Sequence, residues 1–87
     1  MTTQDIITQL RQFIRAEFKI GENDRDFNDD VHLFDYGYVD SFGAVTLTTY
    51  VENSFNVKIS ETDMIAHPLN TIGQIAAFVV RRSKGEI

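Results

Sequence analysis

The sequence contains no cysteine, which excludes a disulfide framework, a thiolate nucleophile and a zinc–cysteine site. No stretch approaches the ~20 apolar residues that a membrane-spanning helix needs. The N-terminal stretch MTTQDIITQL also lacks the basic segment and the long apolar run of a signal peptide. The lack of cysteine does not indicate whether the protein lies in an oxidising or a reducing compartment. The other two absences predict a protein that spans no membrane and resides in the cytoplasm.

Basic residues are scarce in the middle of the chain. The 87 residues carry a net charge of -5, and a chain of this length is expected to form a single domain, residues 1–87. Between residues 22 and 63 there are ten acidic residues but only two basic ones, Arg25 and Lys58. Nucleic acids and anionic lipids are polyanions, so this distribution argues against both as partners. It is typical of a solubilising loop or of a surface that attracts a basic protein.

Apolar residues recur at helical spacing through residues 3–18, which predicts an amphipathic helix. Thr2 or Thr3 is suited to cap its start, and Gly21 to end it. Residues 22–40 follow without any period, although so long a loop is unusual in a compact domain and usually indicates function. The apolar side chains expected to pin this loop onto the core are Phe27, Val31, Leu33 and Phe34.

The helical pattern resumes at Ser41, and either Asp40 or Ser41 is suited to cap the new helix. Its β-branched residues are mediocre helix formers, so a strand is the alternative. Strict alternation fails, however, and the run is long for a strand, which favours the helix. The expected apolar stripe consists of Phe42, Val45, Val51 and Phe55, with Leu47 and Thr48 at its edges.

Two further helix starts follow. Ser60-Glu61-Thr62-Asp63 is typical of a capping box that opens a short helix, which Pro68 ends near Ala66 or His67. Thr71-Ile72-Gly73-Gln74 is a second expected capping box, and it opens the last helix. The sequence therefore predicts an all-α fold, a four-helix bundle with three longer helices, a short third helix and a long loop between the first two. The expected apolar side of the last helix consists of Ile72, Ile75, Ala76, Phe78 and Val79.

An acidic part of the first loop has the spacing of a calcium-binding EF-hand loop. Two features argue against a metal site. Asp29 stands where the sharp turn needs glycine, and Asp35 is short for the bidentate position. The residues at the ligand positions are Asp24, Asp26, Asn28, Asp30, His32 and Asp35.

Ser41, a histidine and an aspartate also suggest a hydrolytic triad, with His32 or His67 as the base. The sequence has no G-x-S-x-G motif, and a chain of this size can hardly enclose a substrate pocket of several hundred cubic ångströms. We therefore expect that the protein is not an enzyme.

Ser41 has a second interpretation besides helix capping. A hydroxyl at a helix N-terminus faces free amides and the positive end of the helix dipole, which stabilise a phosphate ester. The long preceding loop leaves this hydroxyl accessible, and the acidic residues nearby attract a basic modifying enzyme. Ser41 is therefore either a cap or a modification site.

The stretch LFDYGYVDSFGAVTLTTYVENSFNVKI, residues 33–59, resembles the core of acyl and peptidyl carrier proteins. The resemblance extends over nearly the whole chain. It implies that a phosphopantetheinyl transferase attaches 4′-phosphopantetheine from coenzyme A to Ser41, and that the terminal thiol carries an acyl or aminoacyl group as a thioester. The matching features are the pair Leu33-Phe34, then Gly37, Asp40-Ser41-Phe42, Glu52, Phe55 and Ile59.

The resemblance also implies partner enzymes, because in such systems the catalysis belongs to the partners and the reactive sulfur to the cofactor. These are the transferase, an adenylating acyl or aminoacyl ligase, and acyltransferase or condensing enzymes. The residues that the resemblance assigns to partner recognition are Asp35, Tyr38, Asp40, Phe42, Val45, Thr46, Thr49, Glu52, Met64 and Ile65.

The sequence departs from the fatty-acid type of carrier at two points. Glu52 is the only acidic residue of the second expected helix, and Thr48 replaces an apolar core residue. A hydroxyl there disfavours a long buried acyl chain, so we expect a small or polar cargo. The aromatic loop looks more like stand-alone aminoacyl or D-alanyl carriers, which suggests a monomeric carrier in secondary metabolism. The alternative is an unmodified acidic helical adaptor that binds a basic protein.

Overall fold

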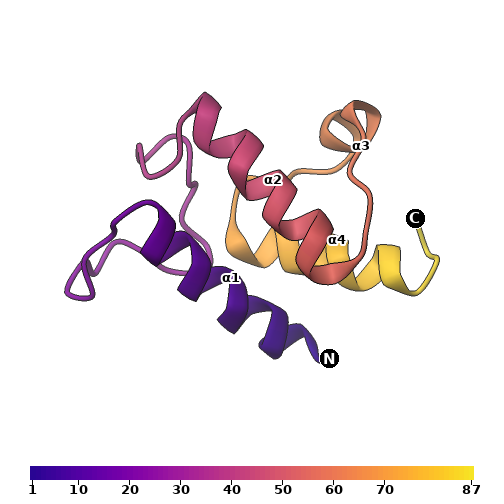
Figure 1. Cartoon of the computed structure of the whole chain (residues 1–87), viewed down its shortest axis with the longest axis horizontal. Coiled ribbons are helices and arrows are strands. Elements are labelled where there is room, and N and C mark those ends of the chain that lie inside the picture. Colours follow the sequence, from indigo (N-terminus) through magenta and orange to yellow (C-terminus); the bar gives the residue numbers. More distant parts are fainter.

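The computed structural model describes residues 1–87 and contains four α-helices and no strand, which confirms the all-α prediction (Figure 1). None of these helices is both long enough and apolar enough to cross a membrane. The helices are α1 (Thr3–Glu17), α2 (Ser41–Phe55), α3 (Glu61–Ala66) and α4 (Ile72–Ser83). Helices α1 and α4 pack against each other, while α3 lies at the periphery between two extended segments (Figure 1).

Each helix follows a residue whose side chain accepts a hydrogen bond from the first turn. Thr2 and Ser60 form full capping boxes, as predicted for Ser60. The prediction of a capping box at Thr71–Gln74 is wrong. Thr71 caps α4, but the Gln74 side chain accepts a hydrogen bond from the Asn70 backbone N–H at 2.9 Å. The long glutamine side chain reaches past the cap and fixes the segment that enters α4.

The first helix ends earlier than predicted. It stops at Glu17, and the chain turns before Gly21 is reached. Lys19 adopts the left-handed conformation with φ of 55°, and the Ile20 backbone N–H then donates to the Arg15 carbonyl at 2.9 Å. Ile20 is buried. Burial of this side chain fixes the turn, so no glycine is needed to end the helix.

The buried face of α2 differs from the predicted stripe. Val51 is buried as predicted, but Phe42 and Val45 are 87% and 67% exposed, and the residues buried with Val51 are Gly43 and Leu47. Because α2 is apolar around most of its circumference, hydrophobicity alone does not identify the face that meets the core. In α4, by contrast, the predicted side is the buried one. Its members are Ile72, Ile75, Ala76, Phe78 and Val79.

The loop between α1 and α2 bridges α1 and α4. Arg11 on α1 donates two hydrogen bonds from Nη2 to the Asp29 carboxylate, at 2.8 and 2.9 Å. The Leu33 backbone N–H donates to the Asn70 carbonyl at 2.9 Å, just before α4. Polar contacts at Asp29 and Leu33 therefore hold the middle of the loop, and apolar side chains along its length pack into the core. Its buried side chains are Phe27, Val31, Leu33 and Val39.

Helix α3 contributes no buried residue and is fastened to α4 by an ion pair. Arg82 Nη2 donates to Asp63 Oδ1 at 2.6 Å, and the two side chains are 26% and 15% exposed. The Arg82 guanidinium also lies over the Phe78 ring, 5.0 Å from its centroid. Asp63 is thus both the capping-box residue of α3 and its link to the rest of the protein.

Replacing Asp63 by asparagine is expected to lower the melting temperature at neutral pH. Hydrogen bonds from the Ser60 backbone N–H and from Arg82 favour the carboxylate, and they hold the pKa of Asp63 below its ordinary value of 3.8. The stability that such a group supplies is present above the unfolded-state pKa and is lost as the pH falls through the folded-state pKa.

Thermal unfolding should therefore show a wild-type advantage at pH 7 that begins to shrink near pH 4 and vanishes at lower pH. Glu61→Gln is the control, because Glu61 lies in the same first turn but its side chain makes no hydrogen bond. Equal melting temperatures of the wild type and Asp63→Asn at pH 7 would contradict the role given to Asp63.

Candidate functional site

Ser41 is the first residue of α2 and not its cap. The cap is Asp40, whose Oδ1 accepts a hydrogen bond from the Gly43 backbone N–H at 2.7 Å. Ser41 is exposed, and its hydroxyl makes no hydrogen bond within the protein. The sequence left open which of the two residues caps the helix. In the structure Asp40 caps the helix, so the Ser41 hydroxyl is not needed for capping.

The first turn of α2 presents unpaired backbone donors beside this hydroxyl. Asp40 satisfies the N–H groups of Gly43 and Ala44, which leaves those of Ser41 and Phe42 without a partner in the protein. The positive end of the helix dipole lies at the same place. The donors present here therefore fit a phosphate ester on Ser41, because its oxygens are acceptors and carry negative charge.

The start of α2 is seated closely on two apolar side chains. A Cβ atom on Gly43 would lie 2.6 Å from Phe18 Cε1 and 3.1 Å from Val39 Cγ1. This close approach fixes the helix two residues after Ser41, and so it fixes the direction in which Ser41 points. The sequence pattern does not single out Gly43 as a packing contact, and its only signal is a glycine near the start of a helix rich in β-branched residues.

Gly43→Val is expected to reduce the free energy of unfolding by about 1–3 kcal/mol, because added methyl groups must displace Phe18 and Val39. Chemical denaturation measures this loss. The matched control is Gly21→Val, since a Cβ atom on Gly21 meets no atom within 4 Å. Losses of the same size at both positions would show that close packing at Gly43 is not the cause.

Two tyrosines of the loop before α2 have different roles. The Tyr38 hydroxyl donates to the Asp24 carboxylate at 3.0 Å, and its ring meets the edge of Phe27 at a centroid distance of 5.5 Å. Partial burial of the phenol and the hydrogen bond to Asp24 raise the pKa of Tyr38 to about 12. Tyr36 stacks on Tyr38 from the solvent side and is exposed. Tyr38 therefore closes the loop, while Tyr36 stays on the surface.

The residues predicted for partner recognition fall into two groups. Tyr38 and Glu52 are half-buried and engaged within the protein, because Tyr38 binds Asp24 and the Glu52 carboxylate accepts a hydrogen bond from the Ile59 backbone N–H at 2.9 Å. The others are exposed, and those on α2 and α3 include apolar side chains. The exposed group consists of Asp35, Asp40, Phe42, Val45, Thr46, Thr49, Met64 and Ile65.

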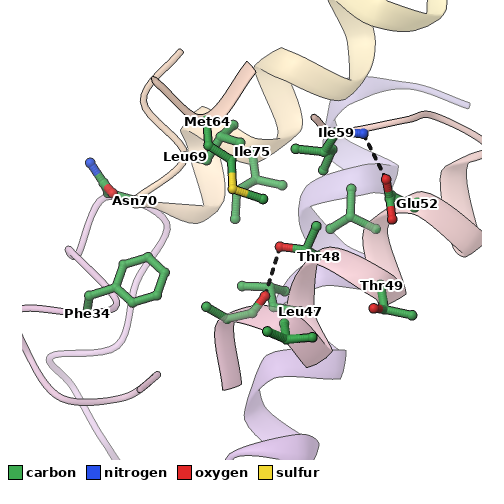
Figure 2. A pocket seen from close by; sticks show the side chains of 13 residues that line it. Phe34, Leu47, Thr48, Thr49, Glu52, Ile59, Met64, Leu69, Asn70 and Ile75 are labelled. Carbon is green, nitrogen blue, oxygen red and sulfur yellow. Dashed lines mark hydrogen bonds between the residues drawn. The ribbon is translucent and has the colours of Figure 1, made fainter. Parts of the chain in front are cut away.

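A partly open pocket of about 520 Å³ lies between α2, α3 and the start of α4 (Figure 2). The chain does not enclose this space, because it lies between helices and stays open on one side. Most of its lining is hydrophobic. The lining residues are Phe34, Ala44, Val45, Leu47, Thr48, Thr49, Val51, Glu52, Ile59, Met64, Leu69, Asn70 and Ile75.

The EF-hand-like stretch of the first loop is organised by other contacts. Asp24 accepts the Tyr38 hydroxyl hydrogen bond, and Asp29 pairs with Arg11. No three histidine, aspartate or glutamate side chains come close enough together to hold a metal ion.

Neither histidine is placed to act on Ser41. His32 Nδ1 accepts a hydrogen bond from the Asp35 backbone N–H at 3.0 Å. His67 packs against the Phe78 ring at a centroid distance of 5.6 Å. Neither side chain hydrogen-bonds to Ser41, so the structure does not bring the triad suggested by the sequence together.

The chain matches the model of a known protein family. This model is described as a phosphopantetheine attachment site and covers residues 8–79. The match includes the start of α2 with Ser41 and every residue that lines the pocket.

Proposed function

The chain belongs to the phosphopantetheine-attachment family, whose members are carriers with covalently attached 4′-phosphopantetheine, and we propose that Ser41 is its attachment site. The observation that carries this proposal is the free and exposed hydroxyl of Ser41 at the start of α2. Two unpaired backbone N–H groups of the same turn support the assignment, because they are suited to donate hydrogen bonds to the phosphate oxygens.

In the attachment reaction, a partner transferase joins Ser41 Oγ to the pantetheine phosphate of coenzyme A and releases adenosine 3′,5′-bisphosphate. The bound arm supplies a terminal thiol, which holds an acyl group as a thioester. The chain itself has no cysteine, so this thiol is its only source of reactive sulfur. The roles of the protein are to hold the arm at a fixed helix end and to present a surface to partner enzymes.

The carrier is proposed to act as one stand-alone, monomeric unit over residues 1–87, in the cytoplasm. Its cargo is a small acyl or aminoacyl group for secondary metabolism, loaded by an adenylating ligase and passed to acyltransferase or condensing enzymes. The exposed apolar residues Phe42, Val45 and Ile65 support docking of these enzymes on α2 and α3. The acidic residues of the first loop support attraction of basic partner surfaces.

Intact-mass analysis after incubation with coenzyme A, magnesium and a broad-specificity transferase tests the attachment site. We expect a gain of one phosphopantetheine, and peptide mapping should place it on Ser41 and not on Ser54, Ser60 or Ser83. No gain, or a gain on another serine, would refute the assignment. Partner binding that is indifferent to modification would instead favour an unmodified acidic adaptor.

A further inference from the structure

Charge is distributed unevenly in the pocket between α2, α3 and α4. Glu52 is the only charged residue among those that line it, and no basic residue is present there. Glu52 takes part in none of the ion pairs of the structure. One of its carboxylate oxygens, Oε2, accepts a hydrogen bond from the Ile59 backbone N–H, while Oε1 has no partner (Figure 2). The pocket therefore contains an uncompensated negative charge beside apolar walls.

A second acceptor lies one helical turn before Glu52. The Thr48 hydroxyl donates its hydrogen to the Ala44 carbonyl at 2.8 Å, so only its lone pairs remain for a ligand (Figure 2). Asn70, the one amide side chain of the lining, lies at the opposite end beside Phe34 (Figure 2). The end of the pocket near Glu52 thus offers acceptors and negative charge, a combination that suits a cationic donor.

The position of this acceptor end relative to Ser41 follows from helix geometry. Val45, Thr48 and Glu52 follow Ser41 by 4, 7 and 11 residues, so all four lie along one face of α2. At a rise of 1.5 Å per residue, Glu52 is roughly 16 Å from Ser41 along the helix axis. An extended arm on Ser41 that follows this face passes Val45 first and brings its far end, which bears the cargo, to Thr48 and Glu52.

We propose that this pocket receives the end of the arm and selects a cargo with a protonated amine, that is, an aminoacyl group. Glu52 is the residue that discriminates, since an ammonium group pairs with its carboxylate. An uncharged acyl group of the same size lacks that interaction. The carboxylate of Glu52 repels a cargo that carries a free carboxylate besides the thioester. The inference rests on the proposed attachment at Ser41 and adds the class of cargo.

The test uses two amide-linked, hydrolysis-resistant arms loaded onto Ser41, one ending in an alanyl group and one in a propionyl group. They differ only in the amine, which is protonated at pH 6. The fraction of arm in the pocket is measured by NMR, from the shifts of the Thr48, Leu69 and Ile75 backbone amides. In the wild type we expect the alanyl arm to occupy the pocket about fivefold more than the propionyl arm, the scale of one partly exposed ion pair.

Glu52→Gln supplies the decisive comparison, because glutamine keeps an acceptor for the Ile59 N–H and removes only the charge. In this variant the two arms should occupy the pocket about equally. The control Glu61→Gln removes a charge outside the pocket lining and should keep the fivefold preference for the alanyl arm. Equal occupancy of both arms in the wild type, or a preference that survives Glu52→Gln, would overturn the proposal. Failure to load either arm on Ser41 shows as an unchanged mass and counts against the attachment site instead.

Discussion

Ser41→Ala is expected to abolish phosphopantetheine attachment completely, while the free energy of unfolding stays within about 0.5 kcal/mol of the wild type. The hydroxyl that forms the phosphate ester is lost, so no modified product remains. Stability is preserved because Asp40 caps α2 and the Ser41 hydroxyl makes no hydrogen bond within the protein. Alanine is also a better helix former than serine.

Intact-mass analysis and urea denaturation measure the two halves of this prediction. Ser54→Ala is the matched control, because Ser54 is an exposed serine of the same helix, and it should leave attachment unchanged. Asp40→Ala should lose about 1 kcal/mol of stability, as expected for the loss of an N-cap. Residual attachment in Ser41→Ala would contradict the proposal, and so would a loss of stability as large as that of Asp40→Ala.

The second large effect is expected from Leu33→Ala, which should reduce the free energy of unfolding by about 2–5 kcal/mol. Leu33 is fully buried, with 0% of its surface exposed. Its backbone N–H donates to the Asn70 carbonyl, and its carbonyl accepts from the Val39 N–H at 3.1 Å. Burial of the side chain and these two backbone hydrogen bonds together hold the segment before Ser41 in place. An 87-residue protein has roughly 4–13 kcal/mol of total stability, so this loss is a large part of it.

Chemical denaturation tests this prediction against Val45→Ala, which also shortens an aliphatic side chain but at a position that is 67% exposed. The control should change stability by no more than about 0.5 kcal/mol. A loss below about 1 kcal/mol for Leu33→Ala would show that the loop does not depend on this anchor.

The elements whose sequence pattern is strongly amphipathic were predictable. In α4, the spacing of the apolar residues identified the buried side, because the opposite face is polar or charged near its end. In α2, the same reasoning predicted that Phe42 and Val45 belong to the buried apolar stripe, but both side chains are exposed in the structure. That helix carries apolar residues around most of its circumference, so the buried side follows from its packing, including the close approach of Gly43 to Phe18.

The candidate site was predictable in part. The spacing around Asp40 and Ser41 singled out the start of α2, but both residue types can cap a helix, and only the hydrogen bond to Gly43 distinguishes them. The pocket was not predictable, since it joins residues from distant segments such as Phe34, Thr48 and Leu69. The sequence also does not reveal that the Thr48 hydroxyl is satisfied within its own helix by the Ala44 carbonyl.

The Arg82–Asp63 ion pair has a consequence for chimeric carriers. The family match ends at residue 79, before Arg82, whereas Asp63 lies well inside it. A junction placed at the end of the match would therefore remove the partner that fastens α3 and would leave a carboxylate without its cation. A foreign segment spliced after the last turn of α4 keeps that partner, so position 83 is a safer splice site than position 79.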